Sequence, residues 1–296
     1  MTDGPQHRTL LTGADVERTP VPNPDGLVSV AGSIFVKTDD GAVVRIDPTS
    51  RRVTGRVKLD TTHDVSHYCQ GIGTDGTYVW ACATGPRTTG VVQLDPLTLR
   101  KVGGVAVDKV FDQLTLPHNR QGIWVLVNSG RAIAVVDPRT RTSVTYALPY
   151  RCQQVAVSDI RVVTSCSADG RVLVLDPMTG HVLADAHLQS PRLATVVGQD
   201  VWVDTSDGLT RLGPDLSVRT IYSRVTAGLD GDVVTSEGAV WVRGRGGLIW
   251  KIDPQRNVVV DLFQPPSPIS AGSLLVTQDS FWTSASNDGY VARIRR

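Results

Sequence analysis

The sequence contains little glutamate and little lysine. Two of its 29 acidic residues are glutamate, and five of its 30 basic residues are lysine. Both residues are good helix formers, whereas aspartate, which takes the place of glutamate here, favours turns and caps. This usage argues against a predominantly helical protein. The 28 glycines, 17 prolines and frequent valines indicate strands joined by tight turns.

The chain also lacks an excess of charge of either sign, since its formal net charge is +1. The charge balance therefore gives no reason to expect nucleic acid or an anionic membrane surface as a partner. No apolar run approaches the roughly 18 residues of a membrane span, so we expect no membrane insertion. The N-terminal residues lack a basic segment followed by an apolar one, which predicts a cytoplasmic protein unless a leader has been removed.

One phrase recurs along the whole chain. It reads VVRIDPTSRRV at 43–53, VVQLDPLTLRKV at 91–102 and IAVVDPRTRTSV at 133–144, and it ends with a shortened copy, YVARIRR, at 290–296. Its seven anchor positions are Asp47, Asp95, Asp137, Asp176, Gly213, Asp253 and Arg295. A period near 40 residues is typical of the blades of a β-propeller, so seven copies predict seven blades.

Each copy contains four short apolar runs, which we name strands A to D in chain order. The phrases SIFVKT, YVWACA and GIWVLV illustrate strand B, where five of the six tryptophans occupy one equivalent position. Phe35 and Val162 are expected at this position in the first and fourth units. The sequence thus predicts an all-β, seven-bladed propeller of four-stranded antiparallel blades. We interpret the repeated tryptophan as packing between blades.

The last unit ends after its strand C, so its strand D is missing. Residues of about 8–17 precede the first strand A and can supply it. Closing the ring in this way removes an exposed edge. We find no linker or change of composition, and therefore expect residues 1–296 to form a single domain that acts as a monomer. The recurring Asp-Pro pair is interpreted as a turn between strands C and D, because its repetition indicates a scaffold.

The phrase WVLVNSGRAIAVVDPRTRTSV at 124–144 resembles the YVTN-type β-propeller repeat. Phrases like VWVxxxxGxVxRIDP resemble the repeats of the streptogramin (virginiamycin B) lyase propellers. The lyase resemblance implies a magnesium-dependent elimination that linearises a cyclic peptide lactone, with His and Glu side chains near the central channel. This chain departs from that pattern, because its one internal glutamate, Glu237, falls in an A–B turn on the opposite face. No His–Glu set can be carried over.

Ligands of propellers gather at one mouth of the central channel, which the D–A and B–C loops form. The D–A loops differ most among the units, as a binding site on a uniform scaffold requires. The loop at 60–71 is the richest in functional groups. The predicted ligand-binding residues of the D–A loops are Tyr68, Gln70, Tyr150, Arg151, Gln153, Arg192, Asp230 and Ser270.

Three residues of these loops are the candidate catalytic groups. His63 and His67 flank Asp64 in an HDxxH stretch, which could hold a divalent metal such as magnesium, place an acid/base histidine over the channel, or form a solvated loop. The spacing does not decide among these, and we assign no metal ligand. Asp112 could act as a base if burial raises the pKa of its carboxyl group.

Two arginines of the predicted site have two interpretations. The guanidinium groups of Arg151 and Arg192 could clamp a carboxylate or phosphate of a ligand. They could equally form ion pairs with neighbouring aspartates.

The four cysteines fall into two hairpins. If Asp75 and Gly76 form one turn, Cys69 faces Cys82 across the A–B hairpin of the second unit. A turn centred on Asp159 brings Cys152 opposite Cys166 in the fourth. The pairs are either disulfides or reduced thiols. Disulfides would indicate an oxidising compartment, and hence export.

Two functions remain open from the sequence. In the first, the funnel binds a small molecule or peptide and supports a lyase- or hydrolase-type reaction. In the second, the propeller is a non-enzymatic protein-interaction or sensor scaffold. A deep funnel with converging polar groups favours the first, and an exposed apolar mouth without them favours the second.

Overall fold

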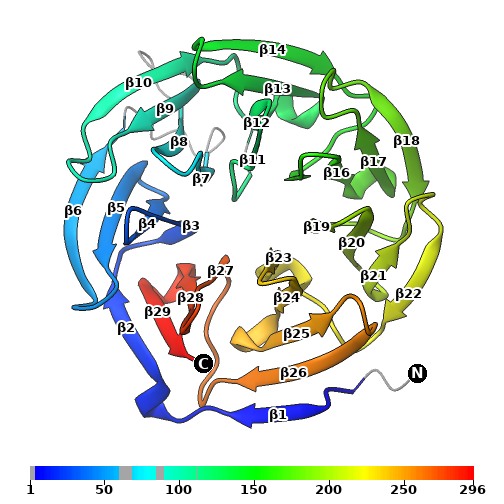
Figure 1. Ribbon diagram of the computed structural model, residues 1–296. Helices are drawn as coiled ribbons and strands as arrows, with labels where there is room; N and C mark the ends of the chain where they lie inside the picture. Colours follow the sequence, from blue (N-terminus) through cyan, green and yellow to red (C-terminus); the bar gives the residue numbers. More distant parts are fainter. Residues whose placement is uncertain (1–3, 60–68, 85–89, 112) are drawn as a thin grey trace.

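The computed structural model describes residues 4–59, 69–84, 90–111 and 113–296. Its strands form seven sheets around a central channel, as a seven-bladed propeller (Figure 1). In each blade, strand A lies nearest the centre of the ring and strand D further out, and neighbouring strands from A to D are antiparallel. The predicted fold class is confirmed.

The first four blades follow one another without interruption. Blade 1 comprises β3 (Pro24–Val30), β4 (Ser33–Thr38), β5 (Ala42–Asp47) and β6 (Arg52–Lys58). Blade 2 comprises β7 (Ile72–Thr74), β8 (Val79–Ala83), β9 (Gly90–Leu94) and β10 (Lys101–Ala106). Blade 3 comprises β11 (His118–Asn119), β12 (Gly122–Val127), β13 (Ala132–Asp137) and β14 (Thr142–Ala147). Blade 4 comprises β15 (Gln154–Val157), β16 (Val162–Cys166), β17 (Arg171–Leu175) and β18 (Val182–His187).

The last three blades include the two ends of the chain. Blade 5 comprises β19 (Ala194–Val197), β20 (Asp200–Thr205), β21 (Gly208–Leu212) and β22 (Val218–Tyr222). Blade 6 comprises β23 (Asp232–Ser236), β24 (Ala239–Arg243), β25 (Ile249–Asp253), β26 (Val258–Gln264) and the N-terminal β1 (His7–Leu10). Blade 7 comprises β27 (Leu274–Val276), β28 (Ser280–Ala285), β29 (Tyr290–Arg295) and the N-terminal β2 (Val16–Pro20).

A strand from the N-terminal segment closes the ring, but its position differs from the expected 8–17. Strand β2 pairs antiparallel with β29, whereas β1 pairs parallel with β26 and adds a fifth strand outside blade 6 (Figure 1). The carboxylate of Glu17 in β2 contacts arginines of blades 1 and 7. It forms an ion pair with Arg51 of blade 1 at 2.7 Å and another with Arg295 of blade 7 at 2.9 Å. Glu17 of the closing strand thus makes contacts within blade 7 and with blade 1.

The tryptophans pack between blades, as their repetition predicts. Trp80, Trp124, Trp202, Trp241 and Trp282 are at most 1% exposed. Each lies in a core cluster with residues of the following blade; Trp241, for example, packs edge-to-face on Phe281 with ring centres 5.1 Å apart. The strand register places Val163, not Val162, at this position in blade 4, because Val162 pairs with Leu175 as Val201 pairs with Leu212. The earlier alignment was wrong by one residue.

The Asp-Pro pairs form the turns between strands C and D. In five blades the aspartate Oδ1 accepts the backbone N–H groups two and three residues further on, for example those of Gln255 and Arg256 at Asp253, at 2.8 and 2.9 Å. The N–H groups of Ser50 and Thr49 lower the pKa of Asp47 in the same way. These bonds satisfy turn backbone that has no strand partner, which accounts for the repetition.

Candidate functional site

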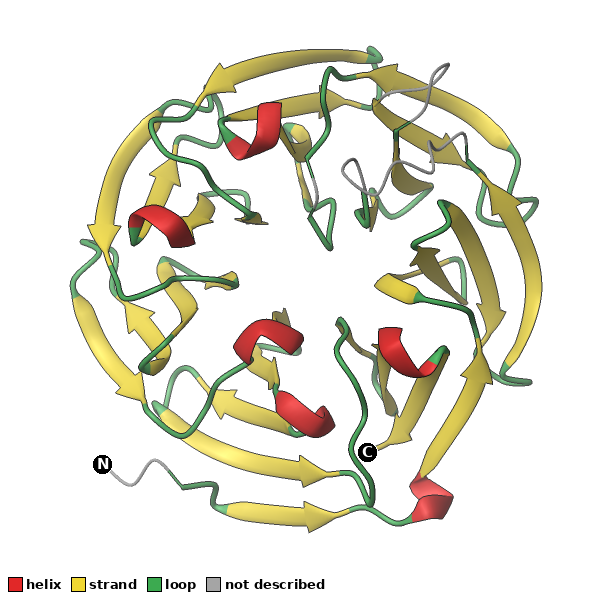
Figure 2. Ribbon diagram, turned by 180° about the vertical axis from the view of Figure 1, so that it is seen from behind, coloured by secondary structure: helices red, strands yellow, loops and turns green. Residues whose placement is uncertain are grey.

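The mouth formed by the D–A loops and B–C turns contains a cavity of about 580 Å³. Four of the B–C connections are single 3₁₀ turns: η3 (Asn128–Gly130), η4 (Ser167–Asp169), η6 (Arg245–Gly247) and η7 (Ser286–Asp288). A fifth turn, η5 (Gly228–Asp230), precedes strand A of blade 6. Figure 2 shows these turns grouped around the central opening. The lining residues come from the D–A loops and turns of blades 2 to 6.

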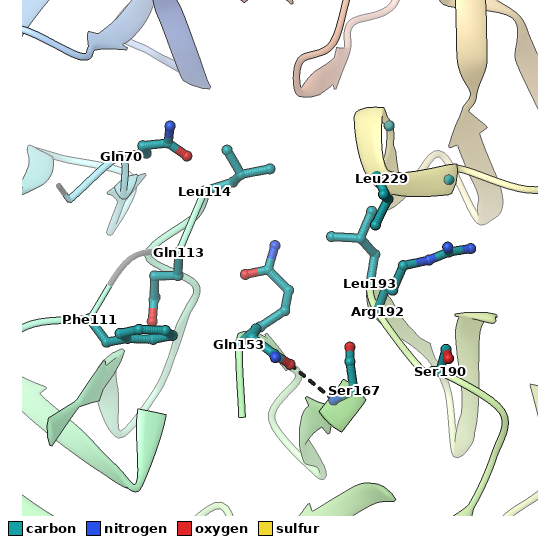
Figure 3. Close-up of a pocket in the computed structure, with 13 residues that line it drawn as sticks. Gln70, Phe111, Gln113, Leu114, Gln153, Ser167, Ser190, Arg192, Leu193 and Leu229 are labelled. Carbon is teal, nitrogen blue, oxygen red and sulfur yellow. Dashed lines mark hydrogen bonds between the residues drawn. The ribbon is translucent and has the colours of Figure 1, made fainter. Parts of the chain in front are cut away.

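Three of the predicted ligand-binding residues meet in this cavity (Figure 3): Gln70, Gln153 and Arg192. Beside Asp230, the neighbouring Gly228, Leu229 and Gly231 also line it. His63, His67, Tyr68 and Asp112 lie outside the described residues, as does the side chain of Asp230. The predicted catalytic groups therefore stay a prediction, and the described part of the site is a cavity lined by amide and apolar side chains.

The guanidinium of Arg192 is engaged with its own blade. Its Nε donates to Asp204 Oδ2 at 2.8 Å, and its Nη2 donates to the carbonyl of Thr205 at 2.9 Å. Figure 3 shows the side chain extending away from Gln153. Of the two interpretations of this arginine, the ion pair with an aspartate is the one observed. Arg192 lines the cavity chiefly with its stem.

Asp204 is fully buried and is held by a network from the next blade. Its Oδ1 accepts the backbone N–H of Ala227 at 2.8 Å and the hydroxyl of Thr226 at 3.0 Å. Burial raises the pKa of Asp204, against the opposing effects of the Ala227 N–H and the Arg192 charge. The Arg192–Asp204 ion pair of blade 5 is thus connected, through Asp204, to the loop that carries Leu229.

Tyr150, Arg151 and Ser270 do not line the described cavity. Tyr150 packs against the core between blades 3 and 4, with the Arg171 guanidinium 5.8 Å from its ring centre. Arg151 lies over the ring of Phe111 at 5.5 Å. The backbone of Ser270 accepts from Arg243 and donates to Asp288 at 3.1 Å. The observed contacts of these three residues are with other residues of the propeller.

Both cysteine pairs are disulfide-bonded, and each stands beside a glutamine of the cavity. Cys69 precedes Gln70, whose Nε2 donates to Asp39 Oδ1 at 3.4 Å. Cys152 precedes Gln153, and Cys166 precedes Ser167, whose backbone N–H donates to Gln153 Oε1 at 3.0 Å. One covalent bond and one hydrogen bond therefore fix Gln153 against η4.

The register behind the predicted cysteine pairing was wrong, although the pairs themselves form. Thr74 faces Val79, which shifts the blade 2 register by two residues, and Gln154 faces Ser165, which shifts that of blade 4 by one. Cys69 and Cys152 consequently lie before strand A rather than in it. The chain outside a ladder is free to bring their sulfur atoms together.

The apolar side of the cavity was not predicted from the sequence. Leu114, Leu193 and Leu229 point into the same space (Figure 3), and Leu229 is 89% exposed. A leucine at the apex of the polar segment AGLDGD was the available signal. Gln154 was missed because it opens the apolar run QVAV, and its side chain is nonetheless a wall of the cavity.

The carboxyl group of Asp232 lies in the channel below the mouth. Asp232 is 3% exposed, and its oxygens accept the N–H groups of Val233 at 2.8 Å and Leu274 at 2.9 Å. Burial raises the pKa of Asp232 to about 6, and these N–H groups and the charge of Arg243 oppose that rise. Within the described residues, no group of three His, Cys, Asp or Glu side chains is placed to hold a metal ion. That part of the chain also contains no helix long and apolar enough to cross a membrane.

No protein family and no curated protein matches this sequence. Solved structures do match its fold. A streptogramin B lyase superposes with a TM-score of 0.72 at 13% identity, covering 95% of this chain and 97% of the lyase. The propeller domain of Cps50 (Swd1) from Myceliophteria thermophila gives 0.70 at 11% identity, covering 95% and 98%. U3-55K gives 0.72 at 14% identity, covering 96% and 99%. At these identities the likeness shows the propeller fold and no activity.

Proposed function

We propose that this protein binds a neutral small molecule or peptide in the mouth cavity. The observation that carries the proposal is the convergence of Gln70, Gln153 and Gln154 with three leucines around one space of about 580 Å³. This volume lies within the range of about 300–1,000 Å³ of small-molecule pockets. An apolar cavity with a few converging polar groups is the usual form of such a site.

The chemistry of the lining selects a neutral ligand with amide groups. A glutamine side chain both donates and accepts hydrogen bonds, and so complements a peptide bond. Among the described lining residues, Arg192 is the one ionisable side chain, and its charge is already paired with Asp204. Among these described residues, a charged ligand group would find no unpaired ionic partner to offset its lost hydration.

The fold comparison points in the same direction. One solved structure with this architecture is named for streptogramin B, and the lyase-like repeats imply a cyclic peptide lactone as substrate. A peptide with apolar side chains suits the leucines and Phe111. The interaction-scaffold alternative is less well supported, because the cavity brings polar groups together instead of leaving a bare apolar mouth.

Binding can be tested by NMR on protein labelled at its glutamine side chains. The probe is N-acetyl-Leu-Leu-amide, with the same peptide carrying a free C-terminal carboxylate as its charged control. Saturable shifts are expected at the amides of Gln70, Gln153 and Gln154, and none at Gln255 and Gln278 on other turns. The carboxylate form should bind more weakly. Shifts confined to Gln255 and Gln278, or no saturable shift, would contradict the proposal.

A lyase- or hydrolase-type reaction is the finer part of the proposal, and it depends on His63, His67 and Asp112. Streptogramin B incubated with the protein should be linearised. Mass spectrometry separates the two reactions, because elimination leaves the mass unchanged and hydrolysis adds one water. Loss of turnover in His67→Ala with retained binding of N-acetyl-Leu-Leu-amide would support catalysis by this loop. Unchanged streptogramin B, with and without added magnesium, would leave a binding protein and refute the enzyme.

The disulfides bear on the compartment. Both pairs are bonded, which is the condition under which the sequence predicts export rather than a cytoplasmic protein. We therefore propose that the chain works in an oxidising compartment. Alkylation of the protein unfolded in denaturant without reductant, followed by intact-mass measurement, should modify no cysteine, because unfolding would expose any buried thiol. Four alkylated thiols would contradict this proposal.

A further inference from the structure

A second cavity of about 260 Å³ continues the mouth cavity into the channel. Its walls are strands β15, β19 and β23, together with Thr115 and Pro117. Gln154 and Leu193 line both cavities and so stand at the junction between them. A ligand in the mouth cavity that passes these two side chains enters the channel cavity.

The channel cavity has largely apolar walls. Val155 and Ala156 of β15, Ala194 of β19 and Val233 of β23 are buried residues that line it. Its polar side chains mostly bond within the wall, which leaves little for a charged group to pair with.

Two pairs of contacts show this. The hydroxyls of Thr195 and Thr235 bond to each other at 2.7 Å. The carboxyl group of Asp232 already accepts two backbone N–H groups. An apolar group therefore meets a matching surface in this cavity, whereas an anionic group would lose its hydration beside Asp232 without gaining a cationic partner among the described lining residues.

Gln154 is the exception among the polar side chains. It is 7% exposed, and its Oε1 is buried without a hydrogen-bond partner. Leaving a buried acceptor unsatisfied is unfavourable, so the amide gains free energy when a donor reaches it. Its position at the junction means that a ligand spanning both cavities can bring an N–H group there, once the amide turns its oxygen toward the cavity.

We propose that the channel cavity is a subsite for a slim apolar arm, such as an acyl chain or an aliphatic side chain, of a neutral ligand whose amide N–H bonds to Gln154. This inference deepens the proposed function and rests on it. The body of the ligand occupies the mouth cavity. Its arm displaces the contents of the channel cavity, whose volume equals that of about eight or nine water molecules.

The arm can be measured with a series of N-acyl-Leu-Leu-amides, from acetyl through butanoyl and hexanoyl to octanoyl, titrated by calorimetry. Each buried methylene contributes about 0.8 kcal/mol, so affinity should rise about fourfold per methylene until the cavity is full. It should then level off. In Ala194→Leu, which narrows the channel cavity, the acetyl member should bind as to the wild type while the gain with chain length disappears.

Gln154→Leu provides a second variant should Ala194→Leu fail to fold. It should weaken all members that reach the junction by about fivefold or more, the effect of losing one hydrogen bond. Gln255→Leu in the C–D turn of blade 6 is its matched control and should bind like the wild type.

The two proposals fail in different ways. If the acetyl member binds and longer chains bring no gain, the channel subsite is refuted and the mouth site stands. If the gain survives in Ala194→Leu, the arm lies elsewhere and the subsite is refuted. If no member binds, the proposed function itself is refuted for this ligand class.

Discussion

In blades 2, 4 and 5, the chain just before strand A is cross-linked to strand B, by a disulfide in two of these blades and by an ion pair in the third. In blades 2 and 4, a disulfide joins the chain just before strand A to the second half of strand B. In blade 5, Arg192 occupies the first place and Asp204 the second, joined by an ion pair of 2.8 Å. In each blade the residue after the first partner lines the mouth cavity: Gln70, Gln153 or Leu193.

The D–A loops of these three blades share a cross-link beside a residue of the mouth cavity. The residues of the cavity rim differ, but each is attached to its blade by a cross-link one residue away. A covalent link holds at any pH, whereas the ion pair depends on the protonation state of a buried carboxyl group. The blades should therefore respond differently to pH when each link is cut.

The largest loss of free energy of unfolding is expected for Arg192→Met. It leaves the carboxylate of Asp204 buried without its cation, which typically costs 3–5 kcal/mol. Because burial already raises the pKa of Asp204, protonation relieves the defect, and the loss should be smaller at pH 5 than at pH 8. Urea unfolding at both pH values measures this. An equal loss at both would contradict the ion-pair account, and Arg192 is for this reason unsuitable as a test of ligand binding alone.

Removing the Cys152–Cys166 disulfide by serine substitution should destabilise the protein by about 3 kcal/mol, since the two cysteines lie 14 residues apart. The loss should not depend on pH between 5 and 8. Hydrogen exchange at the Ser167 amide should become faster, because the bond to Gln153 loses its support. The Cys69→Ser/Cys82→Ser variant is the control, and should leave exchange at Ser167 unchanged. Faster exchange there in both variants would show that the effect is not local.

Asp232→Asn tests the buried carboxyl group of the channel. The folded pKa of about 6 lies above the ordinary value of 3.8 for an aspartate, so the folded state binds the proton more tightly. The stabilisation from that proton is complete below pH 3.8 and is lost as the pH rises to about 6. The variant should lack this decline, which amounts to about 1–3 kcal/mol. Stability profiles from pH 3.5 to 7 measure it, and a decline as steep in Asp232→Asn as in wild type would refute the assignment.

The smallest loss of stability is expected from a substitution in one of the repeated turns between strands C and D. Asp253→Ala removes two hydrogen bonds to the backbone of one C–D turn, at a cost of about 1 kcal/mol. The affinity for N-acetyl-Leu-Leu-amide should not change, because the turn is a scaffold feature shared by five blades. Thermal unfolding and calorimetry on one preparation measure both quantities. Weaker binding would contradict the separation of scaffold and mouth.

The repeated features of this fold could be predicted from the sequence. Trp80, Asp95 and their equivalents recur because every blade must pack on the next and close the same turn, so period and residue type determine the sheet order. The closing strand lies at 16–20 rather than at the expected 8–17, because it pairs with β29 at the far end of the chain and its Glu17 contacts arginines of two blades. Such long-range pairing leaves no periodic signal.

The mouth was predictable only in part. Its location follows from the D–A loops, and Gln70, Gln153 and Arg192 were found there. The direction of the Arg192 guanidinium was not predictable, because it depends on Asp204 in the adjacent strand. Leu114 and Leu193 resemble ordinary loop or core residues in the sequence, and the closed ring alone brings them onto one surface.

A crystal structure with N-acetyl-Leu-Leu-amide, at a concentration that saturates binding in solution, tests the central claim most directly. The account predicts peptide density in the mouth cavity, with its amide groups bonded to Gln153 or Gln154 and its side chains against Leu114 and Leu229. Density for the peptide only on the opposite face, with water filling the mouth cavity, would contradict it.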